Sequence, residues 1–200
     1  MSSRSVFEEM HHMEPHVQVA RARMGVIMLI VSDVLSVIAI LAAGGYLRTL
    51  DVQRQFGGTD HPPAFLPGLL LAAALVVSGL CYFLWERGAR SGGRSGGRGQ
   101  RVFFFVALLL LIVALVGQIW VARTLGYEAP FHAYASLVLL LSWYSAVHTL
   151  LAVIVGLLLL GRMLRGRLAE HTYVVEVAGY WWYYTVIAAL LMWVFTYIIA

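Results

Sequence analysis

Two ionisable side chains, Asp33 and His148, lie deep inside long apolar runs of the sequence. Asp33 interrupts "GVIMLIVSDVLSVIAIL", and His148 lies near the middle of the run that begins at Tyr134. A charged Asp at the centre of a membrane-spanning helix costs roughly 2.5–3.5 kcal/mol on insertion scales, so it is expected to face protein rather than lipid. We therefore predict a buried polar pair of Asp33 and His148, in which the acid satisfies the imidazole and can fix its tautomer.

The residue pattern leaves two interpretations of this pair open. The pair can be a contact that carries or holds a proton, or it can be a plain hydrogen bond that joins two helices. Other small polar side chains in the same runs are able to supply more interhelical hydrogen bonds of the second kind: Ser32, Ser142, Ser145 and Thr149.

Further ionisable groups in the apolar runs are few. Glu176 lies about one turn into the last run, and Glu86 precedes Arg87 at the end of the second, where we expect it to be interfacial. The sequence shows no nucleophile–base pair, no phosphate-binding glycine loop and no Cys/His metal spacing, so no catalytic and no metal-binding residue is predicted. A membrane haem b usually needs two axial His at matching depth, and His148 is the one deep His, so no cofactor is expected in this chain.

The composition indicates the elements that position these groups. Of 200 residues, 61% are hydrophobic and 12% are charged, which excludes an ordinary soluble domain. Spanning a bilayer takes about 20 apolar residues per helix. The sequence has five such runs: residues 24–47, 65–85, 102–122, 134–160 and 173–199. They predict an all-α bundle of five transmembrane helices over residues 24–200, after a polar N-terminal tail over residues 1–23.

The arginines predict an orientation. All fourteen basic residues are Arg, and they lie between apolar runs rather than on one patch, so the net charge of +4 does not indicate nucleic-acid binding. Three Arg lie on one side of the predicted bundle: Arg48, Arg54 and Arg123. Eleven lie on the other: Arg4, Arg21, Arg23, Arg87, Arg90, Arg94, Arg98, Arg101, Arg162, Arg165 and Arg167. The positive-inside rule then places the N-terminus in the cytoplasm and the C-terminus outside.

Three groups of residues resemble subunit III of haem–copper terminal oxidases in its five-helix form. The first is Ser32-Asp33, which resembles the Ser-acid pair of that family. The second is "YASLVLLLSWYSAVH", where His148 falls on the second of two family His and Arg162 on the basic residue that ends the helix. The third is "EVAGYWWYYTV", where Glu176 and Trp182 fall on family positions.

The chain also departs from the family pattern. Ser145 stands at the position of the first family His, Tyr183 replaces a His, and Val186 replaces an Asp. Of the family motif in the third helix, with its Gln and later Glu, the chain retains Gln118.

The resemblance implies a non-catalytic accessory subunit in a bacterial inner membrane. Such a subunit packs beside the catalytic subunit I and other subunits, binds phospholipid in a cleft between helix groups, and supports assembly and proton uptake. Haem and copper then belong to the partner subunit. By resemblance, Asp33 and His148 form the acid–His contact of the first and fourth helices, while Arg162, Glu176 and Trp182 support the connection of the fourth and fifth helices and a lipid headgroup.

Two alternatives remain open at this point. The same five-helix pattern occurs in the subunit III-like accessory protein of nitric oxide reductase, or of another respiratory complex. An independent proton-coupled transporter could use Asp33 and His148 as a proton relay. The transporter is less favoured because the sequence shows no internal repeat.

Overall fold

The computed structural model describes residues 15–50, 56, 64–90, 98–126, 133–166, 168 and 173–199. Within them lie five long helices, each long and apolar enough to cross a membrane. They are α2 (Pro15–Thr49), α3 (Phe65–Arg90), α4 (Arg98–Thr124), α5 (Ala133–Leu164) and α6 (Tyr173–Val194), which continues as the π-helical turn η1 (Phe195–Ile199). The predicted all-α bundle of five spans is confirmed.

Four of the five helices extend beyond the apolar runs that predicted them. α2 begins at Pro15, nine residues early, so the last nine residues of the expected tail are helical, while residues 1–14 lie outside the described residues. Proline suits the first helical position because the missing N–H has no intrahelical partner there. Hydropathy marks where the bilayer ends, whereas a helix continues until its backbone is broken. Between α3 and α4, the helices likewise continue past the predicted runs: α3 ends at Arg90, α4 begins at Arg98, and residues 91–97 lie outside the described residues.

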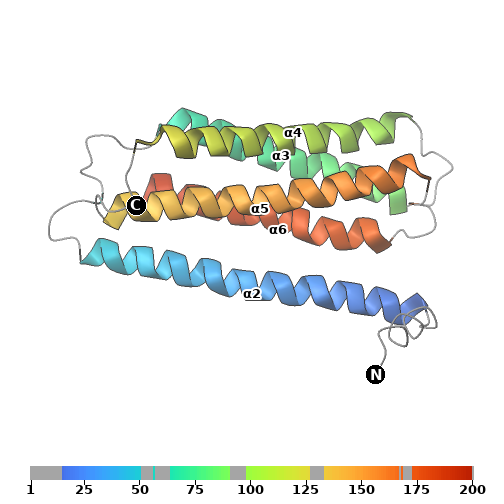
Figure 1. Ribbon diagram of the computed structural model, residues 1–200, viewed down its shortest axis with the longest axis horizontal. Helices are drawn as coiled ribbons and strands as arrows, with labels where there is room; N and C mark the ends of the chain where they lie inside the picture. The colour runs from blue at the N-terminus through green and yellow to red at the C-terminus, as the bar shows by residue number, and fades with distance from the viewer. Residues whose placement is uncertain are drawn as a thin grey trace, which may run out of the picture.

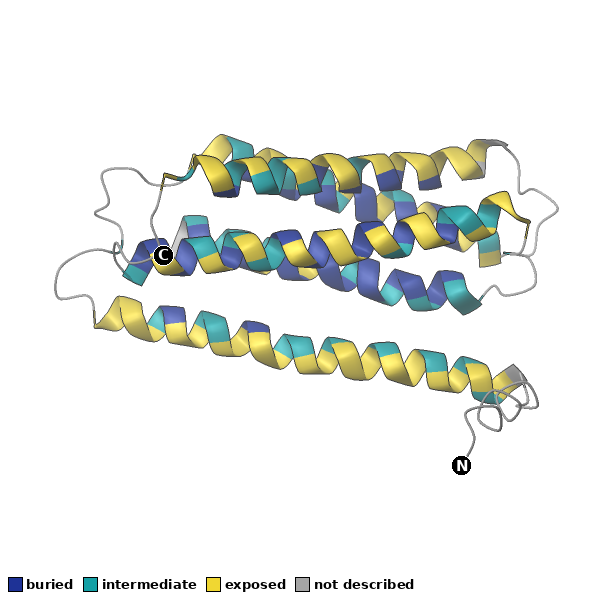
Figure 2. Ribbon diagram, viewed as in Figure 1, coloured by how far each residue is buried: buried dark blue, intermediate teal, exposed yellow. Residues whose placement is uncertain are grey.

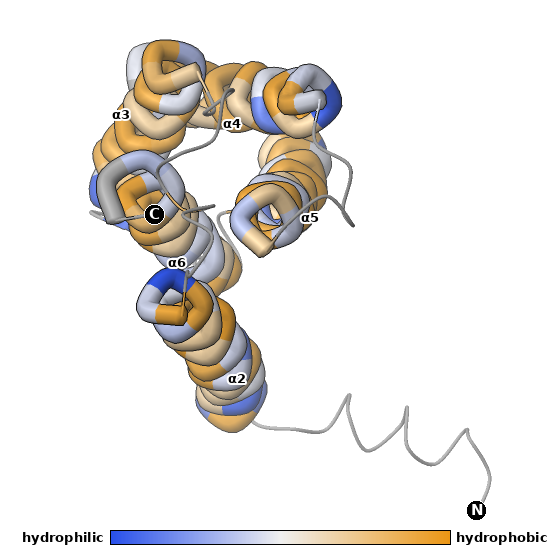
Figure 3. Tube along the Cα trace, turned by 90° about the vertical axis from the view of Figure 1, so that its left-hand side faces the viewer, coloured by the Kyte–Doolittle hydropathy of each residue, from blue (hydrophilic) through white to orange (hydrophobic). Residues whose placement is uncertain are grey.

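Successive helices run antiparallel, as Figure 1 shows. The end-on view in Figure 3 shows α3, α4, α5 and α6 arranged as a ring, with α2 outside it. α2 packs mainly on α6, with a smaller contact to α5. We call the end of the bundle where α2 and α6 begin and α3 ends the Arg-rich end, because Arg23 and Arg90 lie there.

Burial is uneven among the helices, as Figure 2 shows. Half of the membrane-crossing window of α6 is buried, against 6% of that of α2, so α6 is the central helix and α2 the peripheral one. Gly156 illustrates the close packing inside the ring, since a Cβ there would lie 2.7 Å from Leu108 Cδ1 and 3.1 Å from Trp182 Cζ3. Small residues at such contacts let membrane helices approach closely.

Candidate functional site

The structure brings Asp33 of α2 and His148 of α5 together. His148 Nε2 lies 2.6 Å from Asp33 Oδ2. Two tyrosines complete the site: Tyr144 donates its hydroxyl to Asp33 Oδ1 over 2.6 Å, and Tyr184 of α6 donates to Asp33 Oδ2. We call these four residues the Asp33 cluster. It joins α2, α5 and α6 by side-chain hydrogen bonds.

The hydrogen bonds fix how many protons the cluster holds. His148 Nδ1 lies 2.8 Å from the backbone carbonyl of Tyr144, which can only accept, so Nδ1 carries a proton. One further proton is then shared by His148 Nε2 and Asp33 Oδ2. In one state an imidazolium donates to a carboxylate, and in the other a carboxylic acid donates to a neutral imidazole. Both states are neutral overall, which lowers the cost of placing these groups in lipid.

Aromatic rings hold the imidazole in place. The ring of Trp181 stacks on His148, with centroids 5.7 Å apart and planes 10° apart, and the Tyr144 ring lies 4.4 Å away. The side chain of His148 is 6% exposed and that of Asp33 is 20% exposed. The acid is therefore the member of the pair that lies nearer the outside of the bundle.

A second polar group lies at the Arg-rich end, around Glu176 of α6. Arg23 of α2 donates from Nη2 to Glu176 Oε2 over 2.8 Å, and Arg90 of α3 pairs with the same oxygen at 2.7 Å. Tyr180 donates its hydroxyl to Glu176 Oε1. Glu176 therefore links the start of α2 and the end of α3 to α6.

Glu86 belongs to this second group and is buried among the helices near the end of α3. It is 6% exposed, Arg90 Nη1 donates to Glu86 Oε1 over 3.3 Å, and Tyr183 donates to Glu86 Oε2. Gly179 of α6 makes the room, because a Cβ at that position would lie 3.1 Å from Glu86 Oε2. Packing against a glycine of another helix therefore covers the carboxylate of Glu86.

Trp182 and Arg162 have surroundings separate from that of Glu176. Trp182 is fully buried, stacks on Tyr82 of α3 at 4.5 Å and donates Nε1 to Ser78 Oγ over 3.2 Å. Arg162 is exposed on the last turn of α5. Arg162 on the last turn of α5 and Glu176 on the first turn of α6 lie on either side of the connection between these helices. The polar contacts of Glu176 and Trp182 to other helices are with α2 and α3.

The run of five aromatics, Tyr180 to Tyr184, now has a physical reason. Consecutive residues on a helix point in different directions, and α6 has neighbours on several sides. Tyr184 reaches Asp33 of α2, Tyr183 reaches α3, and Trp181 stacks on α5. The roles of Tyr144 and Tyr184 at Asp33 were missed from the sequence.

An apolar groove lies between α2, α5 and α6, on the same half of the bundle as the Arg-rich end. Its volume is about 380 Å³, and its walls include Leu29, Leu158 and Trp181, with Arg162 as the charged residue. The indole Nε1 of Trp181 is buried and has no hydrogen-bond partner among the described residues. The groove thus combines apolar walls with one cation.

Comparisons with known proteins add no family: no family model matches the chain, and no curated protein matches it. Within the described ranges, no three His, Cys, Asp or Glu side chains are placed to hold a metal ion. The fold and the composition define the class of this protein, a multi-pass membrane protein with five apolar helices long enough to cross the bilayer.

Proposed function

We propose that this chain is a non-catalytic accessory subunit of a bacterial respiratory haem–copper oxidase, in the inner membrane. The observation that supports it best is the Asp33 cluster. Asp33 and His148 carry two of the three motifs that resemble subunit III, lie 115 residues apart in sequence, and meet at 2.6 Å. In this proposal the haems and copper belong to the catalytic partner subunit.

The cluster suits a subunit that positions helices beside a partner. α2 has little buried surface of its own, so its hydrogen bonds through Asp33 and Arg23 fix its place on the bundle. Its outer face then offers apolar side chains such as Leu35, which is 63% exposed, to lipid or to the catalytic subunit. The proton shared within the cluster is compatible with a supporting role in proton uptake.

The apolar groove supports the proposal that the subunit binds phospholipid. A channel lined by Leu29 and Leu158 fits an acyl chain, and Arg162 can pair with an anionic headgroup.

Purification of the native complex tests the proposal. The full chain carries an affinity tag and is purified from its own membranes in mild detergent, followed by a haem spectrum and mass spectrometry of the copurified subunits. We expect a haem-bearing catalytic subunit, and oxygen consumption rather than nitric oxide consumption by the complex. A complex that lacks haem and copper would refute the proposal. Proton transport by the isolated chain in liposomes would favour a transporter instead.

A further inference from the structure

The carboxyl group of Asp33 has one acceptor position that the bundle leaves unfilled. A carboxylate offers about four lone pairs to hydrogen-bond donors. Oδ2 accepts from Tyr184 and contacts His148 Nε2, whereas Oδ1 accepts from Tyr144 alone. One lone pair of Oδ1 is therefore open in either state of the shared proton, and the side chain of Asp33 is 20% exposed.

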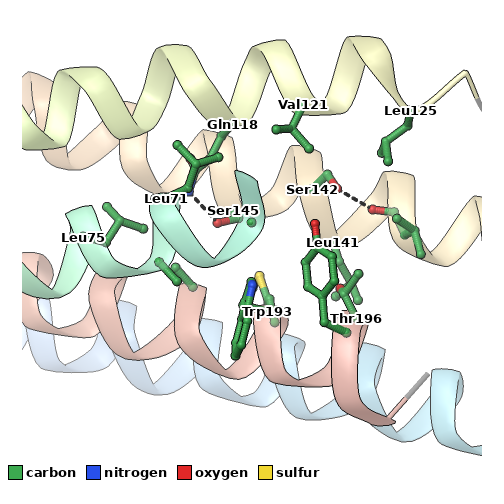
Figure 4. A pocket seen from close by; sticks show the side chains of 16 residues that line it. Leu71, Leu75, Gln118, Val121, Leu125, Leu141, Ser142, Ser145, Trp193 and Thr196 are labelled. Atoms are coloured by element: carbon green, nitrogen blue, oxygen red, sulfur yellow. Dashed lines mark hydrogen bonds between the residues drawn. The ribbon is translucent and has the colours of Figure 1, made fainter. Parts of the chain in front are cut away.

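Polar side chains inside the ring of α3–α6 pair with each other instead. The pocket that Figure 4 shows has a volume of about 80 Å³, and Gln118 and Trp193 are among the residues that line it. There Gln118 of α4 donates its amide nitrogen to Ser145 Oγ of α5 over 3.0 Å. Asp33 differs because it belongs to α2, the peripheral helix, and keeps an exposed edge.

The surrounding lipid cannot fill the open position of Asp33. Asp33 lies ten residues after Arg23 of the Arg-rich end, which is about 15 Å along α2 and about half of the hydrocarbon thickness. Acyl chains carry no hydrogen-bond donor, and the donors of phospholipid headgroups lie at the membrane surface. Because ionisable groups at this depth face protein, the missing donor is expected to come from a protein.

α2 itself carries hydroxyl donors at the depth of Asp33. Ser32 and Ser36 are exposed and lie within one turn of the acid. Ser36 Oγ donates to the backbone carbonyl of Ser32 over 3.3 Å, which is longer than the usual range of about 2.5–3.0 Å, so a better acceptor can replace this one. Two parallel copies related by a two-fold axis along the membrane normal bring equal depths together. A second copy therefore offers donors where Asp33 lacks one.

We propose that a second copy of this chain docks on α2 around Ser32, Asp33 and Ser36, and that a serine hydroxyl of each copy donates to Asp33 of the other. Serine side chains are small, so the two helix backbones can approach closely. Charge does not oppose the contact, because each Asp33 cluster is neutral overall. The proposal is independent of the proposed function, since it concerns two copies of this chain and not its association with other subunits.

Disulfide crosslinking of the full chain in its own membranes tests the contact. Cys81, the one cysteine of the chain, is replaced by Ser, and a reporter cysteine then replaces Ala39 or Ile38, which are both exposed. Ala39 lies three residues after Ser36 and seven after Ser32, so it shares their face of α2, whereas Ile38 points to another side. Under mild oxidation we expect a dimer of this chain to form several-fold faster with Ala39→Cys than with Ile38→Cys.

Replacement of Ser32 and Ser36 by Ala separates hydrogen bonding from close packing, because alanine is small but has no donor. Both serines are exposed, so this double variant keeps the buried core of the bundle. In the Ala39→Cys background it should slow dimer formation several-fold. Equal rates for Ala39→Cys and Ile38→Cys, or no slowing by the serine replacements, would overturn the proposal. A crosslink of Ala39→Cys to a different chain, identified by mass spectrometry, would overturn it as well.

Discussion

Removal of the Asp33 carboxylate is the sharpest test of the cluster that holds α2. In Asp33→Ala, three groups lose a hydrogen-bond partner at once: the hydroxyls of Tyr144 and Tyr184, and Nε2 of His148. His148 keeps its bond from Nδ1 to the carbonyl of Tyr144, so its ring stays in place. The change therefore measures the bonds to Asp33 rather than a collapse of the site.

The size of the loss follows from the number of bonds. Interhelical hydrogen bonds in membrane bundles contribute about 0.6 kcal/mol each on average, and at most about 1.7 kcal/mol. Three lost bonds predict that Asp33→Ala lowers the free energy of unfolding by about 2 kcal/mol, which is about a 30-fold change in the equilibrium constant. The loss should fall on the attachment of α2, because Asp33 is the member of the cluster that α2 supplies.

Asp33→Asn separates hydrogen bonding from charge. The amide imitates the protonated acid: Nδ2 can donate one hydrogen to His148 Nε2 and the other to the hydroxyl oxygen of Tyr184, while Oδ1 still accepts from Tyr144. His148 and Tyr144 keep their hydrogen bonds and the Tyr184 hydroxyl loses only its acceptor, so we expect a smaller loss than in Asp33→Ala, below about 1 kcal/mol. An equal loss in Asp33→Asn and Asp33→Ala would contradict the neutral, shared-proton description of the cluster.

The assay is reversible unfolding of the purified full chain in bicelles, followed by tryptophan fluorescence. Leu35→Ala is the matched control, because Leu35 lies on α2 two residues from Asp33 and is 63% exposed. We expect the control to unfold like the wild type. Unchanged stability of Asp33→Ala would refute the reasoning, because it would mean that the three bonds contribute nothing.

Two further substitutions probe the Arg-rich end. Gly179→Ala places a methyl group against Glu86 and should lower the free energy of unfolding by about 1–3 kcal/mol. Gly45→Ala on α2 is the control and should leave this free energy unlowered, because the space around Gly45 is open. Thermal melting compares the two variants, and equal melting temperatures would be the contrary result. Glu176→Gln should lower the free energy of unfolding by less than about 1 kcal/mol, because both arginine partners are well exposed. The side chain of Arg90 is 50% exposed and that of Arg23 is 44% exposed. That cost should shrink further in high salt, and a salt-independent loss would contradict it.

The depth of Asp33 and His148 in their apolar runs was sufficient to predict that they meet, because lipid offers no other partner to either group. The same reasoning did not reveal the partners of Glu86. Nothing near it in sequence indicates that Gly179, 93 positions later, leaves room for its carboxylate. The two tyrosines at Asp33 were missed for a similar reason, since a tyrosine in an apolar run reads as lipid-facing or packed until its neighbours are known.

The sequence by itself determined the five spans, their alternation and the pair at Asp33, because each follows from the cost of exposing polar groups to lipid. Hydropathy is the same on every side of a helix such as α6, so it could not say which helix lies at the centre. The tertiary structure decided that α6 is central and α2 peripheral, that Glu176 links α2 and α3, and that Gln118 and Trp193 line one cavity. These depend on the rotation of each helix about its axis, which small residues and aromatic contacts between helices set.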